Sequence, residues 1–246
     1  MRAIEYRISA AQLQAHLFEI TLTIAQPAAQ QQVSLPVWIP GSYLVREFSK
    51  HLQHLRAEQA GSPVRIEQRN KCSWIINCVA GQSLTLHYQV YAFDNSVRTA
   101  WLDTQRGFFN GTSLCLRVHG QEHAPQRLSL IQQGLPKNWQ AACALPPLKV
   151  SANGFGSYLA NDYDELVDAP VMLGRFWSGS FVAAGVPHRF VVDGVTPSFD
   201  GERLLADSQR ICETAIHFWH GKSRSPKNRP PHANYLFMLN AVDNGY

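Results

Sequence analysis

Two pairs of histidines are the first residues in this chain whose type and spacing could bind a metal ion. His51 and His54 lie three positions apart, and so do His217 and His220. A catalytic zinc site on a helix needs two histidines four positions apart with a glutamate between them, because one helical turn then directs all three side chains toward the metal and its water. Neither pair has that spacing, an intervening carboxylate or an evident third ligand. We therefore interpret all four as ordinary histidines, and we expect no metal site and no catalytic residue in this chain.

Arg46 is a candidate binding residue within the stretch 38–52, WIPGSYLVREFSKHL. Pro40-Gly41 predicts a turn, because proline presets one backbone angle and glycine accepts the positive φ of the next position. If the chain after the turn is extended, Arg46 shares a face with the apolar Leu44 and Phe48. A guanidinium among apolar groups needs a carboxylate or several carbonyls as partners. The sequence leaves open whether that partner is a structural ion pair.

Other motifs that could indicate chemistry are weak. The acidic run 162–168 lacks the regular ligand positions and the glycine of a calcium-binding loop, so we interpret it as a solvated linker. The sequence has no nucleophilic serine elbow, no phosphate-binding glycine loop and no recognisable cysteine-nucleophile signature.

Composition predicts a soluble, globular protein. The 246 residues include 45% hydrophobic and 16% charged residues, and the net charge is +4. The basic residues are scattered, so we expect no nucleic-acid partner. No stretch is long and apolar enough for a membrane span, and the charged N-terminus does not match a secretory signal. The five cysteines form no close pairs, which favours reduced thiols and a cytoplasmic location.

Alternation of apolar and polar residues predicts that the first part of the chain, residues 1–160, is an all-β domain. Short strands at this spacing are typical of antiparallel sandwiches or barrels and not of alternating α/β folds. The expected strands are two within residues 3–24, followed by 33–39, 64–68, 72–78, 83–93, 113–118, 127–131 and 139–142.

The second part, residues 161–246, is expected to combine strands with one long helix. Residues 175–192 alternate like strands around a turn at 185–187. Between 202 and 219 the apolar residues recur every three or four positions, which predicts an amphipathic helix that Asp200 caps and Gly221 ends. A last strand is expected at 235–242.

Four segments, in order, resemble the glycyl aminopeptidase family, metallopeptidase family M61. They are the stretch 38–52, VRTAWLD at 97–103, GFFNGTSLCL at 107–116 and YDELVDAPVMLG at 163–174. In that family a β-rich domain precedes a thermolysin-like zinc domain and a PDZ domain. The resemblance therefore implies a mainly β fold, with an N-terminal antiparallel β-sandwich-like domain followed by the incomplete, α+β start of a thermolysin-like catalytic domain.

The resemblance also implies which residues could face a substrate. In zinc aminopeptidases of this layout the β-domain can close one end of the cleft, so Tyr43, Arg46, Arg98 and Asn110 are our candidate substrate-binding residues. Asn110-Gly111 is typical of a tight turn that presents an amide at its tip, and Arg98 could bind a peptide carboxylate or carbonyl. The alternatives are that Asn110 only forms the turn, and that Arg98 only pairs with Asp94 or Asp103.

Two functional hypotheses follow. The first is the N-terminal portion of a zinc-dependent aminopeptidase, with the zinc-binding HExxH helix, the missing catalytic and PDZ domains and the peptide substrate belonging to the complete protein. On this hypothesis the chain is inactive alone and serves as scaffold and cleft wall. The second is a non-catalytic β-sandwich module that binds peptide, carbohydrate or protein, since a fold does not fix a function.

Overall fold

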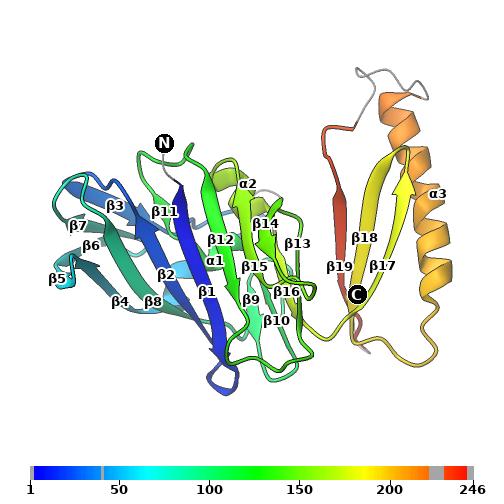
Figure 1. Ribbon diagram of the computed structural model, residues 1–246, viewed down its shortest axis with the longest axis horizontal. Helices are drawn as coiled ribbons and strands as arrows, with labels where there is room; N and C mark the ends of the chain where they lie inside the picture. The colour runs from blue at the N-terminus through cyan, green and yellow to red at the C-terminus, as the bar shows by residue number, and fades with distance from the viewer. Residues whose placement is uncertain (1–2, 40–41, 222–229, 243–246) are drawn as a thin grey trace. The chain divides into compact units, whose positions relative to one another are not determined.

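The computed structural model describes residues 3–39, 42–221 and 230–242, and the chain forms two compact units that divide after Gly174 (Figure 1). The boundary predicted from the sequence is residue 160. The observed division is later because β16 (Val171–Gly174) pairs with β10 (Arg106–Phe109) and with β13 (Gln140–Cys143). These pairings make residues 161–174 part of the first unit.

An eight-stranded sheet forms one layer of the first unit, in the order β14-β15-β12-β1-β2-β8-β4-β5. Its strands, in chain order, are β1 (Ile4–Gln12), β2 (Leu17–Ile24), β4 (Leu52–Gln59), β5 (Ser62–Val64), β8 (Leu84–Tyr91), β12 (Gln126–Ile131), β14 (Pro147–Val150) and β15 (Gly156–Ala160). Neighbouring strands run antiparallel, except that β1 and β12 pair in parallel. The sandwich is therefore antiparallel apart from one pair of strands.

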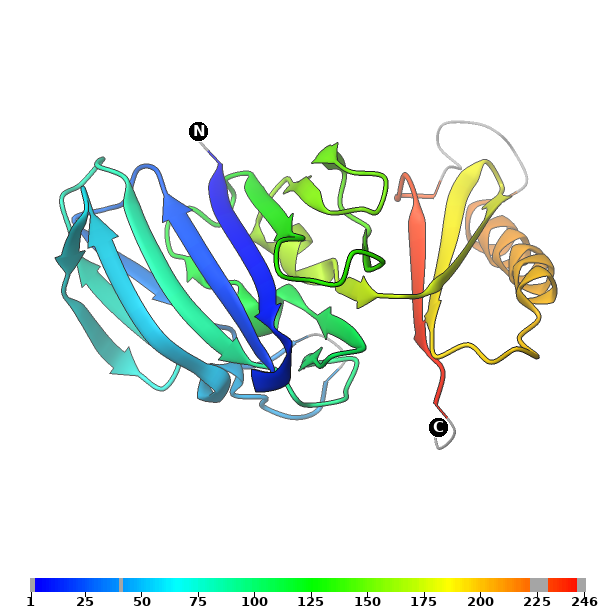
Figure 2. The same ribbon diagram turned by 60° about the horizontal axis from the view of Figure 1, so that its bottom comes forward.

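Two four-stranded sheets complete the first unit. One has the order β13-β16-β10-β9, with β9 at Ala100–Leu102. The other, β11-β3-β7-β6, contains β3 (Gln30–Ser34), β6 (Ile66–Asn70), β7 (Ser73–Asn77) and β11 (Arg117–Val118). Figure 2 shows β3, β6 and β7 behind β1, β2, β4 and β8.

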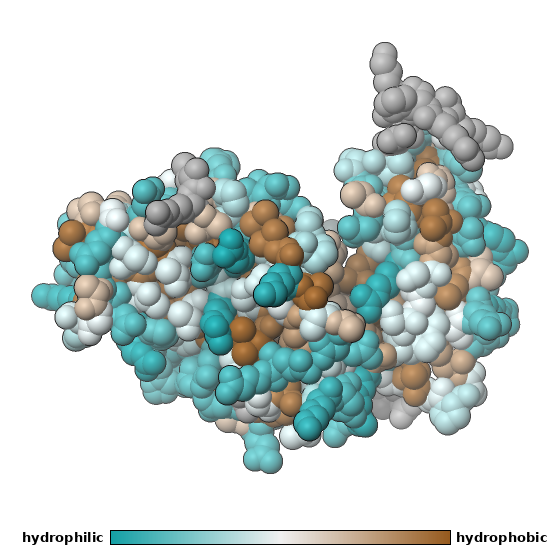
Figure 3. Space-filling view, in the orientation of Figure 1, coloured by the Kyte–Doolittle hydropathy of each residue, from teal (hydrophilic) through white to brown (hydrophobic). Residues whose placement is uncertain are grey.

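One hydrophobic core joins these sheets, because alternate residues of each strand point inward. Ile20 and Leu22 of β2 share it with Ile76 of β7 and Leu102 of β9. On the face shown in Figure 3, hydrophobic residues of the first unit reach the surface only in small, separate patches. The mainly β, sandwich-like fold expected from the alternation is confirmed.

The second unit is a three-stranded sheet with a helix. Its order is β17-β18-β19, formed by Trp177–Ala183, Val186–Asp193 and Tyr235–Asn240, with β18 and β19 parallel. Helix α3 (Gly201–His220) packs Leu204, Leu205 and Ile216 against Phe181 and Phe190 of the sheet. The expected caps are confirmed: Asp200 accepts a hydrogen bond from the Arg203 backbone N–H at 2.9 Å, and Gly221 ends the helix with φ 74°. No described helix is long and apolar enough to span a membrane.

The acidic run is a short helix, not the solvated linker that we expected. Helix α2 (Tyr163–Asp168) buries Tyr163 and Leu166 in the core of the first unit. Asp162 caps it by accepting from the Glu165 backbone N–H at 2.8 Å, and the Glu165 carboxylate accepts from the Asn161 N–H in return. Three of the carboxylates that suggested a linker, Asp162, Asp164 and Glu165, lie at the start of this helix, and Asp168 is its last residue.

Candidate functional site

A single buried helical turn, α1 (Gly111–Leu114), forms the base of the candidate site. Asn110 precedes it with an extended backbone, and the turn lies against α2. A Cβ on Gly111 would lie 3.0 Å from the Val167 Cα and 3.1 Å from the Leu166 carbonyl oxygen, so a larger residue here would force α2 to shift by a few tenths of an ångström. The strand predicted over 113–118 is therefore wrong for residues 113–116, and only Arg117–Val118 is a strand.

Three tyrosine hydroxyls fix the chain that leaves α1. Tyr88, Tyr163 and Tyr6 donate to the carbonyl oxygens of three successive residues, Leu114, Cys115 and Leu116, at 2.7, 2.8 and 2.8 Å. These carbonyls follow a helix end, where the helix itself supplies no donors. Burial raises the pKa of all three hydroxyls well above their ordinary value, so they remain protonated donors.

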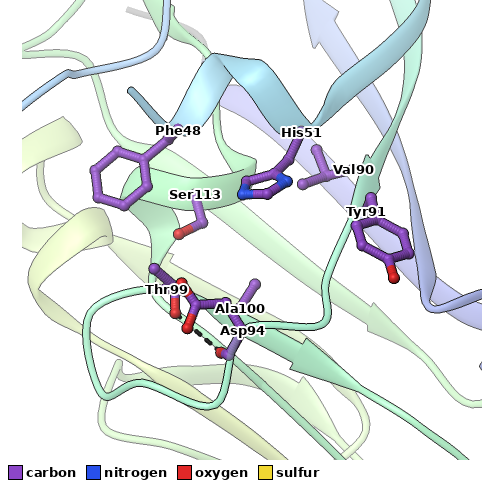
Figure 4. Close-up of a pocket in the computed structure, with 8 residues that line it drawn as sticks. All are labelled: Phe48, His51, Val90, Tyr91, Asp94, Thr99, Ala100 and Ser113. Carbon is purple, nitrogen blue, oxygen red and sulfur yellow. Dashed lines mark hydrogen bonds between the residues drawn. The ribbon is translucent and has the colours of Figure 1, made fainter. Parts of the chain in front are cut away.

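A small cavity lies where α1 meets the 3-10 turn η2 (Phe48–His51) and the loop 94–99. Its lining residues are Phe48, His51, Val90, Tyr91, Asp94, Thr99, Ala100 and Ser113. In Figure 4, Ser113 lies in the middle of the view, with Phe48 and His51 on either side of it and Thr99 below.

The polar groups of this cavity are only partly satisfied. The buried Ser113 hydroxyl has no hydrogen-bond partner among the described residues. Burial lowers the pKa of His51, the nearby Lys50 lowers it further, and the Asp94 carboxylate opposes both effects. The sequence singled out His51 only as one of a pair of histidines, and it gave no indication of Ser113, because these two residues come together only through the packing of η2 on α1.

Arg46 belongs to a loop, so the condition under which it would share a face with Leu44 and Phe48, an extended segment, is not met. Its Nε donates to the hydroxyl of the buried Ser42 at 3.1 Å, and its backbone N–H donates to the Val37 carbonyl at 2.7 Å. The Trp38 indole donates to the Ser42 carbonyl at 2.7 Å. Ser42 thus replaces the expected carboxylate or carbonyl partner, and no carboxylate of the described chain pairs with Arg46. The predicted Pro40-Gly41 turn lies outside the described residues.

The side chain of Asn110 ties α1 to the loop 94–99 by donating to the Val97 carbonyl at 2.7 Å. Within that loop the Thr99 hydroxyl donates to the Asp94 carbonyl at 3.0 Å, as Figure 4 shows. The amide of Asn110 is therefore engaged internally and is not presented at a turn tip. Arg98 is exposed, and within the described chain it pairs with neither Asp94 nor Asp103.

Three of the four predicted site residues, Arg46, Arg98 and Asn110, lie within three positions of residues that line this cavity. Arg46 lies two residues before Phe48, Arg98 directly precedes Thr99, and both Phe48 and Thr99 line the cavity. Asn110 lies at the start of α1, and Tyr43 is fully exposed in the loop before η2. Whether these side chains bind a substrate stays a prediction.

The described residues do not supply a zinc site. No three His, Cys, Asp or Glu side chains among them are grouped so that they could hold a metal. His51 is the last residue of η2 and lines the cavity, and His217 and His220 lie in the last turn of α3. The cavity itself is lined by the apolar side chains of Phe48 and Val90 and by the polar side chains of His51, Asp94 and Thr99, among others.

Comparison with known proteins identifies relatives. The model of the Peptidase M61 N-terminal domain matches residues 5–175, which correspond to the first unit. A search of curated proteins gave no match. Among solved structures, an aminopeptidase N family protein from Idiomarina loihiensis is 39% identical, with a TM-score of 0.90, and the alignment covers 99% of this chain and 40% of that one.

More distant structures share the fold. An M1 zinc metallopeptidase from Deinococcus radiodurans is 14% identical with a TM-score of 0.53, covering 99% of this chain and 56% of that one. Legionella pneumophila aminopeptidase A, solved with aspartic acid, is 12% identical with a TM-score of 0.53, covering 98% and 28%. This chain spans less than two thirds of the length of each of these relatives.

Proposed function

The chain belongs to the family defined by the Peptidase M61 N-terminal domain, and from this we propose that it is the N-terminal portion of a zinc-dependent aminopeptidase of the glycyl aminopeptidase type. Such an enzyme removes N-terminal residues from peptides. The observation that carries the proposal is the match over residues 5–175, supported by 39% identity to an aminopeptidase N family protein over 99% of this chain.

In this proposal the chain serves as scaffold and cleft wall. Tyr43, Arg46, Arg98 and Asn110 border the cleft, and the first three contact the peptide. Asn110 holds the loop 94–99 in position through Val97. The zinc ion, its histidine ligands and the general base belong to the catalytic domain of the complete protein, and a PDZ domain follows it. The described residues of this chain offer no group that could bind zinc.

The test compares this chain with the full product of its reading frame. Bound zinc is measured by atomic emission, and hydrolysis is measured with glycyl and alanyl p-nitroanilide. If the proposal holds, we expect bound zinc and peptide hydrolysis only in the longer product. Zinc at one ion per molecule, or hydrolysis by the 246-residue chain alone, would contradict the scaffold role.

Variants separate the peptide contacts from effects on folding. Arg98→Ala in the longer product is expected to raise KM with little change of Tm, because the Arg98 side chain is exposed. An identical change in the exposed Arg69 of β6 is the matched control. If the reading frame ends at residue 246 and no hydrolysis is found, a non-catalytic β-sandwich module that binds peptide, carbohydrate or protein takes the place of the first proposal.

A further inference from the structure

Helix α3 leaves large apolar side chains exposed to solvent. Ile211, Phe218 and Trp219 are exposed by 67%, 77% and 77%, and the rings of Phe218 and Trp219 meet edge to face with their centroids 5.0 Å apart. All three residues belong to one helix, so the helical backbone itself groups them. Exposed apolar residues that stand singly need no explanation, whereas a group of them at one place indicates an interaction surface.

These side chains lie apart from the face of α3 that packs on the sheet. Leu205, Cys212 and Ile216 contact the core of the second unit, and Figure 1 shows α3 along one face of the sheet. At 3.6 residues per turn, Ile211 and Phe218 lie about 100° or more around the helix axis from that face. No residue of α3 is fully buried. The helix therefore has two apolar faces, and the sheet covers one of them.

The second apolar face has the sequence pattern of a helix–helix seam. Leu204, Ser208, Ile211, Ala215 and Phe218 follow one another at intervals of four, three, four and three residues, and we call these five residues the α3 seam. This spacing is typical of the line along which two helices pack. Large and small side chains alternate along it, so a second helix can approach closely at the small positions.

An antiparallel second copy of α3 matches this alternation. If the two-fold axis lies at the level of residue 213, Ile211 faces Ala215 of the second copy, and Phe218 faces Ser208 of the second copy. Each large side chain then meets a small one, and symmetry repeats both pairs. Such alternation fills the space between two helices without voids or overlap.

The charges of α3 also favour an antiparallel pair. Arg203 and Arg210 both pair with a single carboxylate, that of Asp207. In a parallel pair each arginine would lie level with its own counterpart, and like charges at one level disfavour association. In the antiparallel pair neither arginine does so. Asp207 instead comes level with the last turn of the second helix, which carries His217 and His220.

From these features we propose that the chain forms a homodimer in which the α3 seam packs antiparallel against the α3 seam of a second copy. The interface is isologous, because the same residues of both copies form it. One pair of 20-residue helices is a small interface, so the dimer should be weak and depend on protein concentration. The inference concerns association alone and does not depend on the proposed peptidase activity.

The test is sedimentation equilibrium of the 246-residue chain between about 5 and about 500 µM, where we expect a reversible monomer–dimer equilibrium. Ile211→Glu retains a good helix former but places a charge in the α3 seam. It should weaken the dimer about 100-fold, because both copies lose the burial of an isoleucine. Ala206→Glu adds the same charge at an exposed position on the opposite side of α3, and it should leave the dimer unchanged.

A second set of variants distinguishes specific packing from general apolar association. Ala215→Leu enlarges the exposed apolar surface but places a large side chain opposite Ile211 of the second copy, so it should weaken the dimer about tenfold. Combining it with Ile211→Ala exchanges the large and small positions and should restore most of the affinity. Circular dichroism checks that each variant keeps the helix content of the wild type.

Four outcomes would overturn the inference. They are a chain that stays monomeric over the whole concentration range, a dimer that Ile211→Glu does not weaken, a dimer that Ala215→Leu strengthens, and a monomeric full product of the reading frame. The last would show that the remaining polypeptide covers α3. A dimeric full product without zinc or hydrolysis would instead contradict the proposed peptidase function and support the association.

Discussion

The side-chain amide of Asn110 donates to the carbonyl oxygen of Val97 across 13 positions of sequence, at 2.7 Å. This bond joins the start of α1 to the loop that carries Arg98, so two predicted site residues are parts of one structural unit. A substitution at Asn110 therefore acts on the position of the loop as well as on the loss of an amide.

Asn110→Ala should remove this hydrogen bond and lower stability by about 1 kcal/mol. For a chain of this size that corresponds to a decrease of about 2–4 °C in Tm, measured by thermal denaturation. Asn110→Asp, which retains the size of the side chain but lacks the donor, should behave similarly. Arg98→Ala should leave Tm unchanged. Equal Tm values for all three variants would show that the loop does not depend on this bond.

Tyr163→Phe should cost about 1–3 kcal/mol, because the buried Cys115 carbonyl would lose its donor without gaining access to water. Urea denaturation monitored by circular dichroism measures the change in the free energy of unfolding. The matched control is Tyr91→Phe at an exposed tyrosine, for which the expected change is within about 0.5 kcal/mol. A change of the same size in both variants would contradict the role assigned to the three tyrosines.

The alternation of apolar residues was sufficient to predict most of the sandwich. In β2 and β8 it identifies the buried face directly, and in α3 the helical period and the two caps are read from neighbouring residues. The tyrosine bonds to α1 are different. These hydrogen bonds join residues that lie 26 to 110 positions apart in the sequence. A local sequence pattern cannot indicate which distant residues will meet in the fold.

Two differences between the sequence predictions and the site have physical causes. The run 113–118 has a strand-like composition, but the glycine at 111 allows close packing of a helical turn on α2, and packing prevails over propensity. Arg46 was predicted to share a face with Leu44 and Phe48 only if the segment is extended, and the hydrogen bond from Arg46 to Ser42 instead holds the segment as a loop. For α2, by contrast, the sequence does contain a signal that predicts the start of a helix. Asp162 and Glu165 lie three positions apart, which is the spacing of a capping box.

Gly111→Ala should destabilise the first unit by about 1–3 kcal/mol, because the added methyl group meets backbone atoms that cannot rotate away. Thermal and urea denaturation measure the effect. Adding Val167→Ala removes the Val167 Cγ1 contact but leaves the Cα and carbonyl contacts, so the double variant should not recover wild-type stability. Full recovery would show that α1 and α2 can separate at little cost.

Stability should also depend on pH through His51. Its pKa is lowered in the folded protein, chiefly by burial and then by Lys50, with Asp94 opposing. The folded state therefore binds the proton more weakly than the unfolded state, and protonation favours unfolding. The contribution is present above the unfolded value of about 6.5 and is lost as the pH falls through the lower folded value.

We expect Tm to decrease between about pH 7 and about pH 5, and we expect His51→Gln to reduce that decrease, because glutamine does not titrate in this range. Burial also lowers the pKa values of His119 and His232, so part of the pH dependence should remain in the variant. His123→Gln, at an exposed histidine, is the matched control and should keep the wild-type dependence. Identical pH profiles for His51→Gln and the wild type would mean that protonation of His51 costs the folded cavity nothing, and that the cavity admits enough water to solvate the charge.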